Sequence, residues 1–456
     1  MKLIKKDIQK IISDNIGKAD FLDIRIIESE GTSISFSNKD LEEVSKPRGC
    51  SGIARVLKSG GWGYATFNST ESIKKAVNEA VENSNKVKGD KKTKLAKVEP
   101  VQDRIEASEK EKKFLKIPLK DKVEILQRYN NLIWERGKII VSSSVLYSDM
   151  FVKEVLVNSE GSFIEKEKGY VVSVIRLNSK KDDVVENYTK KIVHHHYDEI
   201  LGKDKVVKDA VDTVEELVQA DNVRSGIRTV VLSPSLAGVF AHEAFGHLSE
   251  ADNVYQSPDL AKVMKMGRKF GSEWVTIIDD PTIKGLRGSH AYDDEGTSTE
   301  KTVLLDKGVL VNRLHSRETA GTMGEKPNGH ARAQGASEVM PRMGTTYIEA
   351  GQDKFKDMLE NTEDGLYCVG WQAGNTDHER FTFTAAYGVE IKNGKLGKMV
   401  RNVKLAGNLF DTLLQIDMVG DDLEYEGGTC GKSGQNIPEC SGAPHIRIKK
   451  IMVMGV

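Results

Sequence analysis

The feature that most constrains the fold is a change of pattern at residues 221–226, about halfway along the chain. Before this point, apolar residues recur at helical spacing between strand-like runs. Beyond it, few long helical patterns remain, and short apolar runs are separated by glycine-rich turns. We therefore predict an α+β fold, with an N-terminal mixed α/β domain over 1–222 and a mainly antiparallel, β-rich domain over 223–456.

The first half alternates predicted strands and helices, and each predicted helix shows an apolar stripe at helical spacing. The predicted elements are strands at 21–28 and 32–37, a hairpin over 52–67, helices over 70–86, 118–136 and 203–220, and strands within 138–177. Lys, Asp and Glu dominate residues 86–117. This composition predicts a solvated, partly loose crossing segment inside the first domain.

Charge and hydropathy narrow the classes of function. The chain has 456 residues, and its 67 Lys and Arg side chains are balanced by 68 Asp and Glu side chains. Nucleic-acid binding proteins usually carry a basic excess, so no nucleic-acid partner is expected. No apolar run approaches the roughly 20 residues of a membrane span, and the N-terminus lacks the apolar core of a secretory signal. We therefore expect a cytoplasmic protein with no membrane partner.

Cysteine and glycine patterns exclude further classes of site. The four cysteines contain no CxxC pair and are too few for a disulfide framework. No P-loop and no GxGxxG sequence after a strand is present, so a phosphate-cradling enzyme is not expected. The triple histidine at 194–196 is predicted to be a loop or strand feature without a catalytic role.

The residues that read most clearly as chemistry are His242-Glu243-Ala244-Phe245-Gly246-His247. They follow a short apolar strand at 229–232, after which Ser233 can cap a helix that begins with Pro234. This segment is predicted to be the active-site helix of the β-rich domain. Two imidazoles beside a carboxylate can hold a zinc ion and activate a water molecule.

The spacing of the two histidines is unusual for a zinc site. The common zinc-peptidase motif places its histidines at i and i+4, whereas His242 and His247 are at i and i+5. On a regular helix these rings would point about 140° apart. A π-bulge would bring them together, or the helix could end near Gly246. The alternative interpretation is a buried helix with two hydrogen-bonded histidines.

A catalytic zinc site needs a third protein ligand, which must come from elsewhere. The candidates are Glu250 and Asp252 nearby, the acidic run Asp293, Asp294 and Glu295, and Cys430 in a glycine-rich segment. We favour Cys430, because the surrounding glycines permit close approach and Lys432 can favour the thiolate. A buried thiol in a glycine-rich turn is the alternative.

Several segments in matching order resemble the TldD/PmbA family of zinc-dependent peptidases. His242–His247 is similar to the HExxxH signature of that family, and Gly428–Gln435 resembles its terminal cysteine motif. Further segments of resemblance are 292–297, 314–320, 328–333, 341–343, 52–56 and 63–66. The resemblance thus extends over nearly the whole chain.

The resemblance implies site residues, a cofactor and partners. It implies zinc (Zn²⁺) bound by His242, His247 and Cys430, with Glu243 as the catalytic carboxylate. It also implies peptide substrates that are short or unfolded, and a homodimer or a heterodimer with an inactive paralogue. Because every metal residue is kept, the chain is similar to the metal-competent, TldD-type subunit. Cys440 is a departure from the family pattern, and its role is open.

The residues support a proposed mechanism. Zinc lowers the pKa of water towards about 7, and Glu243 can act as the general base that removes the proton. Candidates for the group that stabilises the oxyanion or binds substrate are His290, Tyr292, His330 and Arg332.

Two alternatives to a peptidase are compatible with the sequence. One is a non-catalytic regulatory or assembly protein with a structural zinc site, which would need a fourth protein ligand. The other follows an older view of the family as a modulator of DNA gyrase. The near-neutral charge argues against direct DNA contact.

Overall fold

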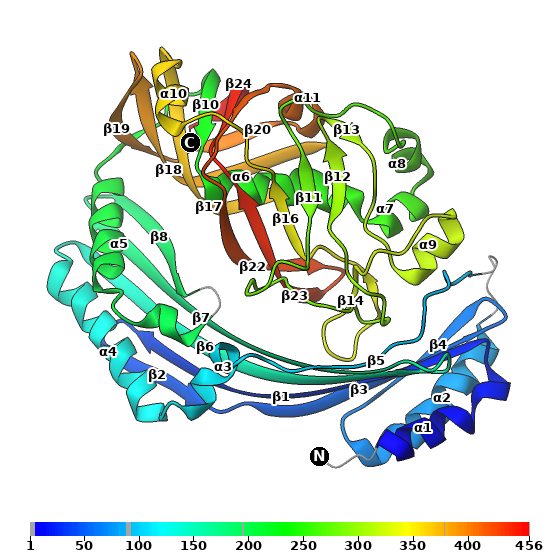
Figure 1. The fold of residues 1–456 in the computed structure, drawn as a ribbon. Coiled ribbons are helices and arrows are strands. Elements are labelled where there is room, and N and C mark those ends of the chain that lie inside the picture. The colour runs from blue at the N-terminus through cyan, green and yellow to red at the C-terminus, as the bar shows by residue number, and fades with distance from the viewer. Residues whose placement is uncertain (1–4, 88–92, 194–195, 378, 456) are drawn as a thin grey trace.

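The computed structural model describes residues 5–87, 93–193, 196–377 and 379–455. The first half forms a long curved sheet, and the second half lies against the concave face of that sheet (Figure 1). Helices and strands are both abundant, and most strand pairs are antiparallel, so the predicted α+β class is confirmed.

The first sheet has the strand order β4-β3-β1-β6-β7-β5, with β2 beside β1 and β8 beside β7. Its strands are β1 (Phe21–Ser37), β2 (Asp40–Ser45), β3 (Arg48–Lys58), β4 (Gly61–Phe67), β5 (Gln102–Ile105), β6 (Ile140–Asn158), β7 (Phe163–Lys181) and β8 (Val184–Val193). All of these pairs are antiparallel except β5 with β7. The predicted hairpin over 52–67 is present as β3 and β4.

One predicted break in this sheet is wrong. The strands expected at 21–28 and 32–37 form the single strand β1, which pairs with β6 without interruption across Glu30 and Gly31. Gly31 is not a turn residue here. A Cβ at this position would lie 2.1 Å from the carbonyl oxygen of Asp149, so glycine permits close approach of the two strands.

Helices cover the convex face of the first sheet at its two ends (Figure 1). These are α1 (Lys5–Ser13) and α2 (Ile73–Lys86) at one end, and α4 (Leu119–Arg136) and α5 (Asp204–Leu217) at the other. Successive side chains of a strand point to opposite faces. On β1, Ile24 and Ile26 therefore join the core under α1 and α2, whereas Asp23 and Arg25 face the second half.

The charged segment 86–117 is more ordered than its composition predicts. Its described part contains β5 and the short helix α3 (Glu109–Lys112), which begins with a capping box between Ser108 and Glu111. Ala96 also contacts the second half, because its N–H donates to the carbonyl of Arg317 and its own carbonyl accepts from Arg317 Nε. These backbone contacts tie the segment to both halves of the molecule.

The second half contains two larger sheets and a two-stranded ribbon. One sheet consists of β9 (Asp221–Asn222), β10 (Gly226–Leu232), β17 (Asp364–Asp377), β18 (Arg380–Lys392), β19 (Lys395–Arg401), β20 (Lys404–Asn408), β21 (Ile416–Val419) and β24 (Ile446–Met454). The other consists of β11 (Ile277–Asp279), β12 (Thr302–Asp306), β13 (Val309–Leu310), β16 (Thr345–Ile348), β22 (Glu424–Lys432) and β23 (Gln435–Ala443). The ribbon pairs β14 (Ala331–Arg332) with β15 (Met340–Pro341).

The helix α6 (Pro234–Ala241) packs between these two sheets, against β17 on one side and β16, β22 and β23 on the other. Its sequence is apolar all round, as expected for a helix that is buried on every side. Gly238 allows this packing, since a Cβ there would lie 3.0 Å from the backbone nitrogen of Gly442 on β23. The buried position of α6 fixes the residues that follow it.

The remaining helices of the second half are short and peripheral. They are α7 (Ala251–Gln256), α8 (Pro258–Val263), α9 (Arg317–Met323), α10 (Phe355–Glu360) and α11 (Leu409–Leu414). Within the described residues, no helix is both long enough and apolar enough to cross a bilayer.

Candidate metal centre

The two motif histidines lie directly after α6, on a turn of different helical geometry. Residues His242–Gly246 form a π-helix, and a 3₁₀ turn follows over His247–Ser249. Of the two arrangements that the i, i+5 spacing allows, the π-bulge is the one present. Gly246 packs closely against Met343, because a Cβ at this position would lie 2.1 Å from Met343 Sδ.

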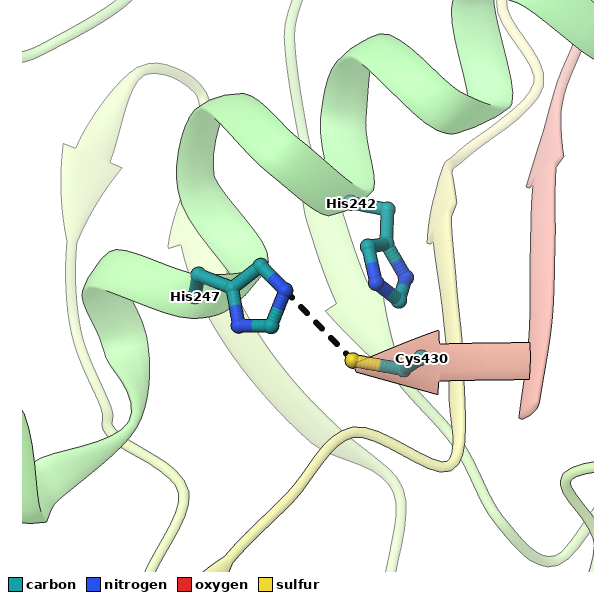
Figure 2. A group of neighbouring side chains, drawn as sticks. All are labelled: His242, His247 and Cys430. Carbon is teal, nitrogen blue, oxygen red and sulfur yellow. Dashed lines mark hydrogen bonds between the residues drawn. The ribbon is translucent and has the colours of Figure 1, made fainter. Parts of the chain in front are cut away.

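The turn brings both imidazoles to the thiol of Cys430, which comes from β22 (Figure 2). The ring centroids of His242 and His247 are 5.1 Å apart, and Cys430 Sγ lies 3.4 Å from His247 Nε2. One donor atom from each of the three residues lies within 4.8 Å of the other two. Three potential ligands from segments almost 190 residues apart thus converge on one point.

Buried carboxylates lie behind both histidines. The Nδ1–H of His247 donates to Glu250 Oε2 at 3.0 Å, and Glu250 is fully buried. On the other ring, His242 Nδ1 lies 3.3 Å from Glu439 Oε2 on β23. A carboxylate behind a histidine orients the ring and makes the opposite nitrogen a better ligand.

The three side chains shift one another's protonation. Burial would raise the pKa of the Cys430 thiol, but hydrogen bonds and charge from His242 and His247 lower this pKa to about 6. Burial would lower the pKa of His247, but Glu250 and Cys430 raise it to about 10. The pKa of His242 is likewise raised, by Glu439 and Cys430 against the effect of burial. These shifts favour the thiolate, which is the ligand form of cysteine.

Glu243 occupies the position after His242 on the same π-helical turn and is partly buried. In the part of the chain that the structure describes, its carboxylate forms no hydrogen bond or ion pair. Glu243 thus differs from Glu250 and Glu439, which both contact a histidine.

The other acidic candidates for a third ligand have different partners. Glu250 supports His247 from behind, and Asp252 accepts a hydrogen bond from Lys432 Nζ at 2.8 Å. The run from Asp293 to Glu295 lies at the interface with the first sheet. Asp293 accepts from backbone N–H groups of its own segment and of Ala331. None of these acidic residues belongs to the cluster of converging donor atoms.

Asp294 and Glu295 belong to an ionic cluster between the two halves. We use this name for Asp23, Arg25, Arg55, Glu154, Lys166, Asp294 and Glu295. Arg55 Nε donates to Asp23 Oδ1 at 2.9 Å, and Lys166 Nζ contacts Asp294 Oδ1 at 2.8 Å. The acidic motif 292–297 therefore holds the second half against the first sheet.

Cys440 faces away from the histidines. Cys430 pairs directly with Ile437 across the β22–β23 hairpin, and Cys440 lies three positions further along β23. An odd number of steps along a strand places two side chains on opposite faces. Burial raises the pKa of the Cys440 thiol, so this residue is a buried thiol on the other side of the hairpin.

The four candidates for oxyanion or substrate contacts are dispersed. His330 is fully buried, and its Nε2 lies 3.1 Å from Asp279 Oδ1. The hydroxyl of Tyr292 donates to Asp103 Oδ2 at 2.8 Å. His290 and Arg332, together with Tyr292, line a large cavity between the two halves. His194 and His195 lie outside the described residues.

The structure adds two residues that the sequence did not single out. Glu439 contacts His242, and Arg342, which is fully buried, donates from Nη2 to the carbonyl oxygen of Cys430 at 2.7 Å. The sequence could have indicated Glu439, because it is a charged residue between apolar neighbours in Ile437-Pro438-Glu439-Cys440. Its partner could not be read from the sequence.

Family models match almost the whole chain. They are the PmbA/TldA metallopeptidase domain 1 over residues 22–84, the central domain over 112–218 and the C-terminal domain over 225–455. A metalloprotease of Synechocystis is 36% identical over 99% of this chain and 98% of its own. A protein of Saccharolobus solfataricus named a zinc metalloprotease TldD homologue is 27% identical over 88% of this chain and 89% of its own.

Solved structures share the fold. A Thermotoga maritima protein, named for a proposed modulation of DNA gyrase, matches 99% of this chain and 100% of its own with a TM-score of 0.81. Its sequence identity is 20%, so this likeness concerns the fold alone. The matched ranges extend over both halves, and the C-terminal range, 225–455, spans the segments that carry the candidate metal centre. The chain belongs to the TldD/PmbA family of metallopeptidases.

Proposed function

We propose that the protein is a zinc-dependent peptidase in which His242, His247 and Cys430 bind the metal ion. The observation that carries this proposal is the convergence of one donor atom from each residue within 4.8 Å. Typical Zn–S and Zn–N distances of about 2.3 and 2.0 Å at a tetrahedral angle separate the two ligands by roughly 3.5 Å. The separation of Cys430 Sγ and His247 Nε2 is 3.4 Å, so this pair of ligands fits zinc.

The number of ligands favours a catalytic site over a structural one. Structural zinc sites have four protein ligands, whereas catalytic sites have three and leave one position for substrate or water. Among the described residues, the cluster contains three His, Cys, Asp or Glu side chains, and Cys440 is not one of them. The alternative of a regulatory or assembly protein with structural zinc is therefore less well supported.

Zinc, when bound here, would supply Lewis acidity that makes a water molecule easier to deprotonate. Glu243 would accept the proton of the attacking water and return it to the leaving amine. Its carboxylate suits this role because no other described side chain engages it. Glu250 and Glu439 would hold the two imidazoles in the orientation that ligation needs.

The substrate would be a short or unfolded peptide in an extended conformation. β22, which carries Cys430, is the last strand of its sheet and pairs with β23 on one side. An extended peptide can add to such an edge by backbone hydrogen bonds that do not depend on sequence. A cytoplasmic location and a dimer, with a second copy or an inactive paralogue, remain predictions.

The substitution Glu243→Gln tests the mechanism. It keeps the size of the side chain but removes the base, so cleavage of an unfolded polypeptide should fall by about two to four orders of magnitude while zinc stays bound. Cleavage would be followed by mass spectrometry and zinc by elemental analysis. Glu273→Gln is the matched control, because Glu273 is exposed and lies outside the site. Cleavage by Glu243→Gln at the control rate would contradict the assigned role.

A further inference from the structure

A large cavity lies between the first sheet and the second half of the molecule. Its volume is about 1150 Å³, and its walls include Val152 and Tyr170 of the first sheet and Thr429 of β22. Thr429 precedes Cys430, and successive side chains of a strand face opposite sides. The cavity and the metal centre therefore lie on the two faces of the same strand.

Among the cationic side chains that line this cavity are Lys168 of β7, Arg287 of the loop after β11, and Arg332 of β14. We call them the cation cluster. Each is held by backbone carbonyl groups. Lys168 Nζ donates to the carbonyls of Arg287 and Ser289 at 2.8 and 2.5 Å, Arg287 Nε to that of Gly428 at 3.0 Å, and Arg332 Nη1 to that of Met343 at 2.8 Å.

The positive charges of the cation cluster are only partly compensated, by Asp294 near Arg332 and by Glu111 near Lys168. Within the described ranges, none of the three side chains forms an ion pair with a carboxylate. Arg287 Nη1 is buried and has no hydrogen-bond partner there. A buried guanidinium nitrogen without an acceptor is costly, and a ligand oxygen would remove that cost.

A neighbouring lysine shows that the arrangement is local. Lys166 lies two residues before Lys168 on the same face of β7 and also lines the cavity. It contacts Asp294 at 2.8 Å and Glu154 at 3.1 Å. On the first sheet, Lys166 is thus paired with two carboxylates, whereas Lys168 forms no ion pair with a described carboxylate.

The pKa values of all three side chains in the cation cluster are lowered, mainly by burial. Burial, and then the charge of Arg332, lower the pKa of Lys168 to about 7. Burial also lowers the pKa of both guanidinium groups. Binding of an anion here would be favourable, because its negative charge would reduce the repulsion among the three cations.

We propose that the cation cluster is a subsite for a carboxylate group of the peptide substrate, either its C-terminus or an Asp or Glu side chain. Guanidinium and ammonium groups bind carboxylates through charge-assisted hydrogen bonds. This inference rests on the proposed peptidase function. A peptide strand beside the edge of β22 would send alternate side chains to its two faces, one towards the metal centre and the next towards the cavity.

Binding of four matched peptides tests the subsite. They share one unstructured sequence with an N-terminal fluorophore and combine a free or amidated C-terminus with an internal Glu or Gln. Fluorescence anisotropy with full-length, zinc-loaded Glu243→Gln protein gives affinities without cleavage. Loss of the recognised carboxylate should weaken binding about ten- to a hundredfold, and the pair of peptides that differs identifies its source.

Variants of the cluster connect the effect to the cavity. Arg287→Gln should weaken the binding of acidic peptides about tenfold or more. It should leave the affinity for the peptide without carboxylates unchanged. Lys168→Met is a second variant, which removes a buried charge and should not compromise folding. Arg224→Gln is the control, because Arg224 is exposed and lies outside the cavity. The same peptides incubated with wild-type protein report cleavage independently.

The outcomes separate the subsite from the proposed function. If the four peptides bind alike, if none binds, or if the cluster variants weaken all four equally, the carboxylate subsite is wrong, even where wild-type protein cleaves every peptide. If acidic peptides bind more tightly through Arg287 and Lys168 but wild-type protein cleaves none, the subsite stands and the peptidase proposal fails.

Discussion

The ionic cluster between the halves and the metal centre both bury several charged groups, but they neutralise them in different ways. In the ionic cluster, basic residues of the first sheet are paired with carboxylates, such as Arg55 with Asp23 and Glu295. In the metal centre, a thiolate and two carboxylates surround two histidines whose ring nitrogens hold protons. The first cluster pairs its charges within the protein, whereas under the proposed function the second would exchange protons for a metal cation.

This difference separates structural roles from functional ones. Removing a residue of the ionic cluster leaves an unpaired buried charge and should reduce stability. Removing a residue of the metal centre should change metal binding and cleavage rather than stability. The surrounding sheets and α6 hold the backbone of the site in place without it. The predictions below test whether the two regions can be perturbed independently.

The largest expected effect on stability comes from Arg55→Met in the ionic cluster. Arg55 is 3% exposed, and its loss strands the carboxylates of Asp23 and Glu295 in a buried interface. The free energy of unfolding, measured in urea, should fall by about 3–5 kcal/mol. Arg48→Met is the matched control, because the exposed pair of Arg48 and Glu30 should contribute about 0–1 kcal/mol.

The comparison also requires that Arg55→Met retain zinc under conditions in which it is folded. A variant that is stable but has lost its metal would show that the two regions are energetically coupled. Equal unfolding free energies for Arg55→Met and Arg48→Met would instead show that the ionic cluster does not stabilise the fold.

A smaller effect is expected from the carboxylates behind the histidines. Glu250→Gln and Glu439→Gln should each weaken zinc binding about 10- to 100-fold, since outer carboxylates orient ligating imidazoles. Competition with a chromophoric chelator measures the dissociation constant, and circular dichroism checks the fold. Zinc affinities indistinguishable from that of Glu273→Gln would show that neither carboxylate acts on the metal through its histidine.

Local patterns predicted the parts of the fold that depend on neighbouring residues. The helices α4 and α5 follow the predicted apolar stripes closely, because each buries one face on the first sheet. The i, i+5 histidine spacing showed that a regular helix could not align the two rings, and a π-bulge was one of the two arrangements that it allowed.

Features that depend on distant pairing were not predictable in the same way. The predicted break between 21–28 and 32–37 is wrong because the close contact of Gly31 with Asp149 involves a strand more than 100 residues away. The roles of Glu439 and the cation cluster likewise depend on which segments meet across a sheet or an interface. Single residues show their charge in the sequence, but their partners are set by the topology.

The most direct test of the account is zinc content measured together with peptide cleavage in Cys430→Ser and Cys440→Ser. The two thiols lie on opposite faces of one hairpin, so they form a matched pair. We predict that wild type and Cys440→Ser bind one zinc ion per chain and cleave an unfolded polypeptide, whereas Cys430→Ser loses both properties while remaining folded. Wild-type zinc affinity and cleavage in Cys430→Ser would contradict the proposed metal centre.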